Sequence, residues 1–167
     1  MKHLLAAVDF SNSTRAVLEQ SRLLAGKLNA RLWIIHVSTD ETATLATTSS
    51  FSDYSPEITS MPGDVQLARD ISAEELKREH NELIALSADL RKKGIEAKAL
   101  LIRGNPATEI LAKAADLKAD MIILGSHGHG LFHKALLGSV SESVIQHAQC
   151  NVLIVPRPGK NTTPPVL

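Results

Sequence analysis

The sequence has little cysteine and no surplus of charge of either sign. Cys150 is the single cysteine among 167 residues, which excludes an internal disulfide framework and a cysteine-rich zinc site. A lone thiol suits a reducing compartment, so we expect a cytoplasmic protein. Lysine and arginine together number 18, and so do aspartate and glutamate. Because binding to a phosphate backbone needs an excess of cations, we expect no nucleic-acid partner.

Long apolar runs and targeting signals are also missing. No apolar run approaches the roughly 20 residues that cross a bilayer, so we expect no membrane insertion. The N-terminal sequence MKHLLAAVDF lacks the long apolar core and the cleavage site of a signal peptide. A length of 167 residues fits a single domain.

Motifs of catalysis and metal binding are absent too. The chain contains neither the G-x-S-x-G motif of serine hydrolases nor the H-E-x-x-H motif of zinc proteases. Ser126 and His127 are adjacent, but adjacency does not predict a catalytic triad. His127 and His129 have only His133 nearby, and a partial ligand set rarely makes a zinc site. We therefore expect no catalytic residue and interpret the protein as a binding protein rather than an enzyme.

Short apolar runs alternate with amphipathic segments along the chain. Runs of strand length occur at 3–9, 31–37, 95–102, 119–125 and 151–155. The first helix is expected after residues 11–14, with Val17, Leu24 and Leu28 on its buried face. A second is expected at 73–93, where the apolar stripe consists of Leu76, Leu83, Leu86 and Leu90. Two more are expected at 107–118 and at 138–148. This alternation is typical of an α/β domain with a parallel sheet and right-handed crossovers.

Two segments lie outside this alternation. Residues 40–68 form a long insertion rich in Ser and Thr, which we interpret as a variable loop, with a functional lid or a partner surface as the alternative. A short helix near 41–47 would fit inside it. Residues 158–167 are expected to be a flexible Pro-rich tail. The domain itself is expected to span residues 1–157.

Capping signals mark several helix ends. Asn105 and Pro106 are expected at the N-cap and the first position of the helix that follows them. Gly94 follows the sequence RKK and predicts a helix end. Ser139 and Glu142 have the spacing of a capping box, so Ser139 is expected to be an N-cap.

The loops that follow three of the strands are the candidate functional site. Ligands of parallel α/β sheets bind at the carboxyl ends of the strands, which selects the loops after Val8, Val37 and Leu124. Asp9, in the first loop, could accept hydrogen bonds from ligand hydroxyls or bind a divalent cation. It could equally cap the next helix, as could Ser11.

Two residues near strand ends have ordinary structural interpretations. His36, beside Val37, is expected to be a half-buried structural histidine. Cys150 opens the last strand and is expected to act as a small buried apolar group, with a reactive thiol as the alternative.

The loop after Leu124 is the most specific of the three. It contains Gly125 and Gly128, and Gly138 precedes the next helix. Glycines let the backbone approach a phosphate closely, and free N–H groups at a helix start form an anion site. Lys134 could add a positive charge. The glycine spacing matches neither the Rossmann G-x-G-x-x-G motif nor the P-loop.

Several motifs follow one another in a recognisable order. The segment from Gly125 to Ser139 fits the pattern G-x2-G-x9-G-[ST]. It is accompanied by VDFS near the start, HV at the end of the second run, GNPATEIL before the third helix and CNVLIVP at the last strand. With these motifs the chain resembles the UspA-type universal stress protein family over residues 2–157.

The resemblance implies a fold, an assembly and a ligand. The fold would be a Rossmann-like (flavodoxin-like, HUP) three-layer α/β sandwich with five parallel strands in the order 3-2-1-4-5. Members usually form homodimers, here through the last strand, Asn151 to Val155. The intact glycine motif implies the branch that binds ATP. Many relatives have Arg or Lys where this chain has His129, which makes AMP a credible alternative to ATP.

The resemblance also implies the site residues, position by position. The glycine loop would hold the ribose and phosphates through Gly125, Ser126, His127, Gly128, His129, Gly138, Ser139 and Val140. Asp9 would lie near the ribose or bind a magnesium ion that accompanies ATP, with Phe10 beside it. Val37 would bind the adenine base through its backbone groups.

The sequence thus predicts an adenine-nucleotide-binding regulatory protein of the stress response, with an unidentified protein partner. A slow ATPase or a nucleotidyl-transfer enzyme is one alternative, and it rests on fold analogy. A dimeric scaffold with an idle nucleotide site is the other.

Overall fold

The computed structural model describes residues 2–39, 62–126 and 137–156, and for 62–69 it describes the helical backbone alone. The helices and strands, in chain order, are β1 (His3–Ala7), α1 (Thr14–Leu28), β2 (Arg31–Ser38), α3 (Pro62–Lys92), β3 (Ala97–Arg103), α4 (Pro106–Asp116), β4 (Met121–Gly125), α5 (Ser139–His147) and β5 (Asn151–Val155). The five strands occur where the apolar runs predict them, and β5 has the predicted bounds.

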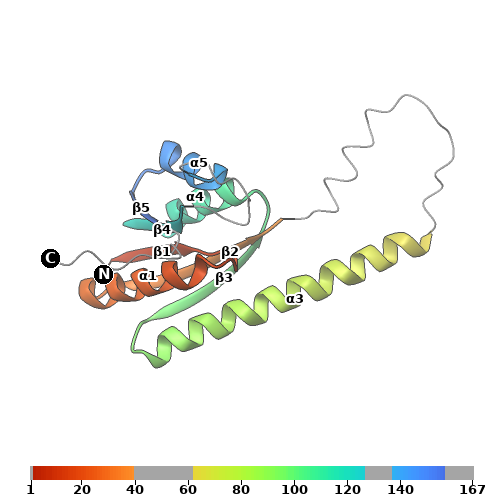
Figure 1. The fold of residues 1–167 in the computed structure, drawn as a ribbon, viewed down its shortest axis with the longest axis horizontal. Coiled ribbons are helices and arrows are strands. Elements are labelled where there is room, and N and C mark those ends of the chain that lie inside the picture. Colours follow the sequence, from red (N-terminus) through yellow and green to blue (C-terminus); the bar gives the residue numbers. More distant parts are fainter. Residues whose placement is uncertain (1, 40–61, 127–136, 157–167) are drawn as a thin grey trace.

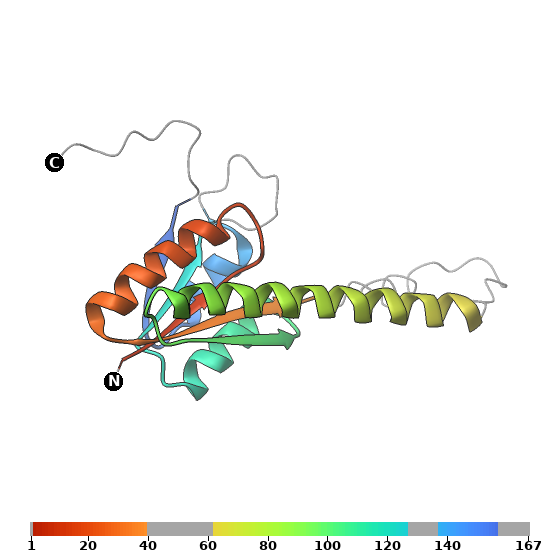
Figure 2. The same cartoon turned by 90° about the horizontal axis from the view of Figure 1, so that it is seen from below.

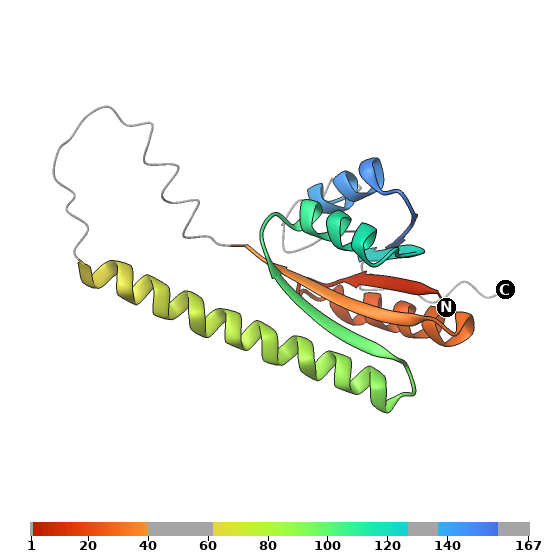
Figure 3. The same ribbon diagram turned by 180° about the vertical axis from the view of Figure 1, so that it is seen from behind.

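The strands form one parallel sheet in the order β3-β2-β1-β4-β5, which confirms the predicted topology. Helices α1 and α3 cover one face, and α4 and α5 cover the other (Figures 1 and 3). The result is the predicted three-layer sandwich. Strand order reverses between β1 and β4, so the chain leaves a crevice at the carboxyl ends of these neighbouring strands.

Burial on both faces explains why the strands are nearly continuous apolar runs. In β2, Leu32 and Ile34 pack in the cluster below α1 and α3. Trp33 and Ile35, which alternate with them, pack in the cluster below α4 and α5. Side chains of a strand point to opposite faces in turn, so each strand contributes to two cores.

Two of the predicted helix ends are confirmed. The Asn105 side chain accepts a hydrogen bond from the Thr108 N–H at 3.1 Å, and Pro106 is the first residue of α4. Gly94 adopts a φ of 81°, and its N–H donates to the Arg91 carbonyl at the end of α3. A residue without a Cβ accepts this left-handed conformation at little cost.

Two details of the predicted helices are wrong. The capping box assigns Ser139 to the N-cap, but the N-cap is Gly138, whose carbonyl accepts the Glu142 N–H at 2.9 Å. Helix α5 therefore begins at Ser139, one residue earlier than the capping box predicts, and no side chain of the described residues caps it. Leu28, expected on the buried face of α1, is 38% exposed. The buried face of α1 instead includes Val17, Leu18, Ser21 and Ala25.

Helix α3 begins at Pro62 instead of Ala73, so residues 62–68 of the expected insertion are helical. Proline is favourable in the first turn of a helix, and the residues after Gly63 are mostly good helix formers. The leucine stripe is confirmed, with Leu83 and Leu90 buried. The N-terminal part of α3 projects past the carboxyl ends of the strands (Figures 1 and 2). Residues 40–61, the possible helix near 41–47 and the tail 158–167 lie outside the described residues.

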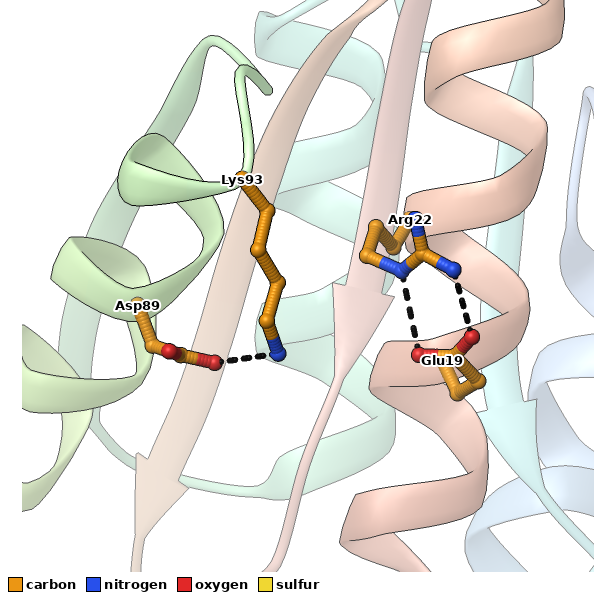
Figure 4. Close-up of polar contacts among 4 residues, drawn as sticks. All are labelled: Glu19, Arg22, Asp89 and Lys93. Atoms are coloured by element: carbon orange, nitrogen blue, oxygen red, sulfur yellow. Dashed lines mark hydrogen bonds and ion pairs between the residues drawn. The ribbon is translucent and has the colours of Figure 1, made fainter.

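Exposed ion pairs lie on the layer formed by α1 and α3 (Figure 4). Arg22 donates two hydrogen bonds to Glu19, at 2.6 and 3.1 Å, and this lowers the pKa of the Glu19 carboxyl, with a smaller contribution from the Lys93 charge. Lys93 donates to Asp89 at 2.7 Å and lowers the pKa of that carboxyl. Because these pairs face water, they add little to the stability that the buried clusters provide.

Candidate functional site

A cleft of about 1090 Å³ opens at the carboxyl ends of β1, β2 and β4. Sites for small molecules commonly have volumes of roughly 300–1,000 Å³, so this cleft could hold a ligand of nucleotide size. Two of its sides differ in composition. The α5 wall consists of Gly125 and residues 137–141, and the α3 wall consists of Glu75, Arg78, Glu79 and Glu82. Asp9, Phe10, His36 and Val37 also line the cleft.

The loop after β1 places Asp9 in the cleft and gives it a structural role as well. Its Oδ1 accepts the Ser11 N–H at 3.0 Å and lies 3.5 Å from the Thr14 hydroxyl. The N-cap of α1 is Ser13, which makes no side-chain capping bond. Asp9 therefore shapes the turn before α1, but neither Asp9 nor Ser11 is the N-cap, so the capping alternative is wrong and ligand contact stays a prediction.

Phe10 has a backbone conformation that side chains rarely adopt. Its φ is 58°, in the left-handed region. A bulky residue there carries strain that the surrounding structure must balance. The Phe10 ring packs against the His36 ring, with the ring centroids 4.3 Å apart. This contact ties the loop after β1 to the end of β2.

The end of β2 carries Val37 and His36, both of which are buried. His36 is thus more buried than the half-buried position expected for it. Its Nδ1 lies 2.8 Å from the Val8 carbonyl oxygen, and its Nε2 lies 3.4 Å from a Glu79 carboxylate oxygen. The histidine therefore links the segment that follows β1 to β2 and α3 at the floor of the cleft.

Glu79 is a site residue that the sequence interpretation missed. It comes from α3, far from the three predicted loops along the chain. A signal was present, because position 79 lies at helical spacing between Leu76 and Leu83 in the apolar stripe of α3. A carboxylate in such a stripe needs a partner, and His36 is that partner.

The α5 wall brings the two ends of the predicted glycine loop together. The Gly138 N–H donates to the Ser126 carbonyl at 2.7 Å, and the Ser141 hydroxyl donates to the Gly125 carbonyl at 2.7 Å. Ser139 and Val140, in the first turn of α5, also line the cleft. First-turn N–H groups have no partner inside a helix, so this wall suits an anion or another acceptor.

Several predicted site residues cannot be placed. His127, Gly128 and His129 lie outside the described residues, as do His133 and Lys134. Within residues 2–39, 70–126 and 137–156, no three His, Cys, Asp or Glu side chains are grouped to hold a metal ion.

The described lining of the cleft is acidic. Asp9, Glu75, Glu79 and Glu82 face it, whereas Arg78 is the single Arg or Lys among the described lining residues, and it pairs with Glu75 at 3.3 Å. In the same lining His36 is the single imidazole, and its ring nitrogens face a carbonyl and a carboxylate rather than a hydroxyl. The described part of the cleft thus offers hydrogen-bonding groups for a ligand.

Cys150 packs, half-buried, in the cluster below α4 and α5. Burial raises the pKa of its thiol, which disfavours the reactive thiolate. This agrees with the expected role as a small apolar group.

Comparison with known proteins identifies the family. The model of the universal stress protein family matches residues 1–156. The chain belongs to this family. It is 32% identical over 155 residues to the universal stress protein YxiE of Bacillus subtilis, covering 91% of this chain and 97% of that protein.

Solved structures of similar proteins establish the same fold. Hypothetical protein MJ0577 aligns with a TM-score of 0.75 at 24% identity, over 96% of this chain and 98% of that one. A universal stress protein from Archaeoglobus fulgidus, solved in complex with dAMP, aligns with a TM-score of 0.57 at 20% identity, over 93% of this chain and 98% of that one. The described residues contain no helix long and apolar enough to span a membrane.

Proposed function

We propose that the cleft binds an adenine nucleotide, AMP or ATP, and that binding serves regulation in the stress response. The observation that carries this proposal is the α5 wall, where two glycines and the first turn of α5 meet at the switch point of a parallel sheet. Family membership and the dAMP complex of a relative with the same fold support the choice of an adenine nucleotide.

Each side of the cleft has a role in this proposal. Gly125, Gly138 and the N–H groups of Ser139 and Val140 hold the ribose and phosphates. Val37, at the end of β2, binds the base through its backbone. Asp9 accepts hydrogen bonds from the ribose hydroxyls, or binds Mg²⁺ when the ligand is ATP.

The acidic α3 wall favours a ligand with few negative charges. Glu75, Glu79 and Glu82 lie on it with Arg78 as the single Arg or Lys, and like charges in a cleft repel. We therefore propose that, in the absence of magnesium, AMP binds more tightly than ATP does. We also propose that Mg²⁺ reduces the difference between the two affinities.

We further propose a cytoplasmic homodimer that regulates a protein partner rather than an enzyme. β5 is an edge strand of the sheet, and its residues Val152, Leu153 and Ile154 are half-buried. An edge strand presents backbone groups to which a second copy can pair. Sedimentation of the wild type tests this assembly, since a monomer in solution would contradict it.

Calorimetric titration with AMP, ATP, ATP with Mg²⁺ and GMP tests nucleotide binding. A ligand present at 100 times its Kd should raise the free energy of unfolding by about 2.7 kcal/mol. Gly138→Val, which places a side chain in the α5 wall, should lose binding while remaining folded. Gly26→Ala is the matched control, because an added Cβ there meets its nearest neighbour, Ile95, at an ordinary 3.7 Å. Absence of binding to every adenine nucleotide would contradict the proposal.

A further inference from the structure

The floor of the cleft contains two buried polar atoms without hydrogen-bond partners. They are His36 Nε2 and Glu79 Oε2, and neither atom has a partner among the described residues. Both side chains line the cleft, where they are 10% and 16% exposed. Because most buried polar atoms in proteins are hydrogen-bonded, unpaired atoms beside a cleft need an explanation. A ligand that supplies the missing group would remove the cost of leaving such an atom unpaired.

Glu79 is better placed than His36 to meet a ligand. The His36 ring is fixed by two contacts, because its Nδ1 lies 2.8 Å from the Val8 carbonyl oxygen and the Phe10 ring packs against it. The Glu79 carboxylate is held less tightly. Its Oε1 lies 3.4 Å from His36 Nε2, which is longer than an ordinary hydrogen bond. The carboxylate can therefore turn toward the cleft while the backbone of α3 stays in place.

The α3 wall calls for a ligand that donates hydrogen bonds. A carboxylate oxygen accepts hydrogen bonds and donates none, so Glu79 Oε2 needs an N–H or O–H group. Glu75 and Glu82, on the same wall, are acceptors as well. Arg78 carries N–H donors, and it contacts Glu75 at 3.3 Å. This wall thus favours a ligand edge with amino groups over one with carbonyl groups.

The α3 wall lies where the proposed site holds the base. Glu79 contacts His36, which precedes Val37 at the end of β2, and Val37 is the residue proposed to bind the base. The phosphates are proposed to lie at the α5 wall. Helices α3 and α5 lie on opposite faces of the sheet (Figures 1 and 3). A nucleotide with its phosphates at α5 therefore extends its base toward Glu79.

We propose that Glu79 determines which purine the cleft accepts. Its carboxylate accepts a hydrogen bond from the exocyclic amino group of adenine. Guanine and hypoxanthine carry a carbonyl oxygen at the same position, so two acceptors would face each other there. This inference rests on the proposed nucleotide site and adds to it the residue that selects amino-purines over oxo-purines.

Calorimetric titration with three nucleoside monophosphates tests the inference in the wild type. AMP has the amino group, purine riboside monophosphate has a hydrogen in its place, and inosine monophosphate has a carbonyl. All three share the ribose and phosphate, so contacts at the α5 wall cancel in the comparison. AMP should bind about tenfold more tightly than purine riboside monophosphate, the size of one hydrogen bond to a charged group. Inosine monophosphate should bind most weakly. Equal affinities for AMP and purine riboside monophosphate would overturn the inference.

Glu79→Gln tests the residue itself. The amide keeps the size of the side chain and adds an N–H donor that can face the carbonyl of inosine monophosphate. The preference for AMP over inosine monophosphate should therefore shrink by at least about tenfold. Glu74→Gln is the matched control, because Glu74 is an exposed residue of the same helix and does not line the cleft. It should keep the wild-type preference.

The preference separates base selection from a structural role. A general distortion of the cleft weakens all three nucleotides alike and leaves their ratios unchanged. If AMP binds and Glu79→Gln keeps the wild-type ratios, the inference about Glu79 fails and the proposed function stands. If the wild type binds none of the three nucleotides and no ATP, the proposed function fails and the inference fails with it.

Discussion

The two walls of the cleft are built from different kinds of groups. The α5 wall uses glycines and backbone N–H groups, and its residues are adjacent in the sequence or joined by one loop. The α3 wall uses ionisable side chains of a helix that comes from the other side of the sheet. The α5 wall can be predicted from a short sequence motif. The α3 wall cannot, because it depends on where α3 packs against the sheet. The predictions below separate what each wall contributes.

The α3 wall should depend most on the core beneath it. Leu83 is 1% exposed, so Leu83→Ala leaves a cavity and should lower the free energy of unfolding by about 3 kcal/mol. Ile84, its neighbour, is 43% exposed, and Ile84→Ala should cost less than about 1 kcal/mol. Urea unfolding measures both. Equal losses would mean that α3 is not held by its leucine stripe.

The α5 wall should depend on open space rather than on stability. Gly138→Val should weaken AMP binding more than about 100-fold, or about 2.7 kcal/mol, because the new side chain fills the cleft at the helix start. Calorimetry and an unfolding curve on the same sample separate loss of binding from loss of fold. If Gly138→Val still bound AMP as the wild type does, the α5 wall would not be part of the nucleotide site.

Asp9 lines the cleft from the loop after β1 and should have a smaller effect. Asp9→Asn keeps an oxygen that can accept the Ser11 N–H and removes the negative charge. We expect AMP affinity to fall about fivefold, since one hydrogen bond to a ligand hydroxyl loses its charge assistance. ATP with Mg²⁺ should lose more than AMP if Asp9 holds the ion. An unchanged affinity for both ligands would place Asp9 in the turn alone.

The exposed pair of Asp89 and Lys93 should matter least. The pKa of Asp89 is lowered by its hydrogen bond to Lys93. A lowered carboxyl pKa contributes stability at neutral pH, which is lost as the pH falls below about 4, through the folded-state pKa. Asp89→Asn should therefore melt like the wild type in concentrated salt and differ slightly only at low salt and neutral pH. A large difference would mean that this pair does more than an exposed ion pair usually does.

The sequence predicts the sheet well because its strands are buried on both faces. Runs such as RLWIIHV are apolar on both faces, so each strand can be located from the run itself. The alternation of strands and helices then restricts the possible topologies. Asn105 and Gly94 are also predictable, because a side-chain cap and a left-handed turn depend on neighbouring residues alone. Ser139 shows the limit of such local rules, since a one-residue shift of the helix start moves it from N-cap to first turn.

The candidate site is predictable only in part. Gly125, Gly138 and Val37 follow from the glycine motif and the strand ends, and the structure brings them to one cleft. Glu79 does not follow, because its partner His36 is distant in the sequence and the contact depends on where α3 crosses the sheet. The left-handed backbone of Phe10 is also not predictable, since no local sequence pattern indicates that a bulky residue will adopt a φ of 58°.

Mass spectrometry of small molecules released from the purified protein tests the central claim most directly. Wild-type protein, freed of unbound solutes and then denatured, should release an adenine nucleotide, with AMP exceeding ATP. Gly138→Val, purified in parallel, should release none, and Gly26→Ala should match the wild type. Equal yields from the wild type and Gly138→Val, or no adenine nucleotide from a wild type that also fails to bind added AMP and ATP, would contradict the account.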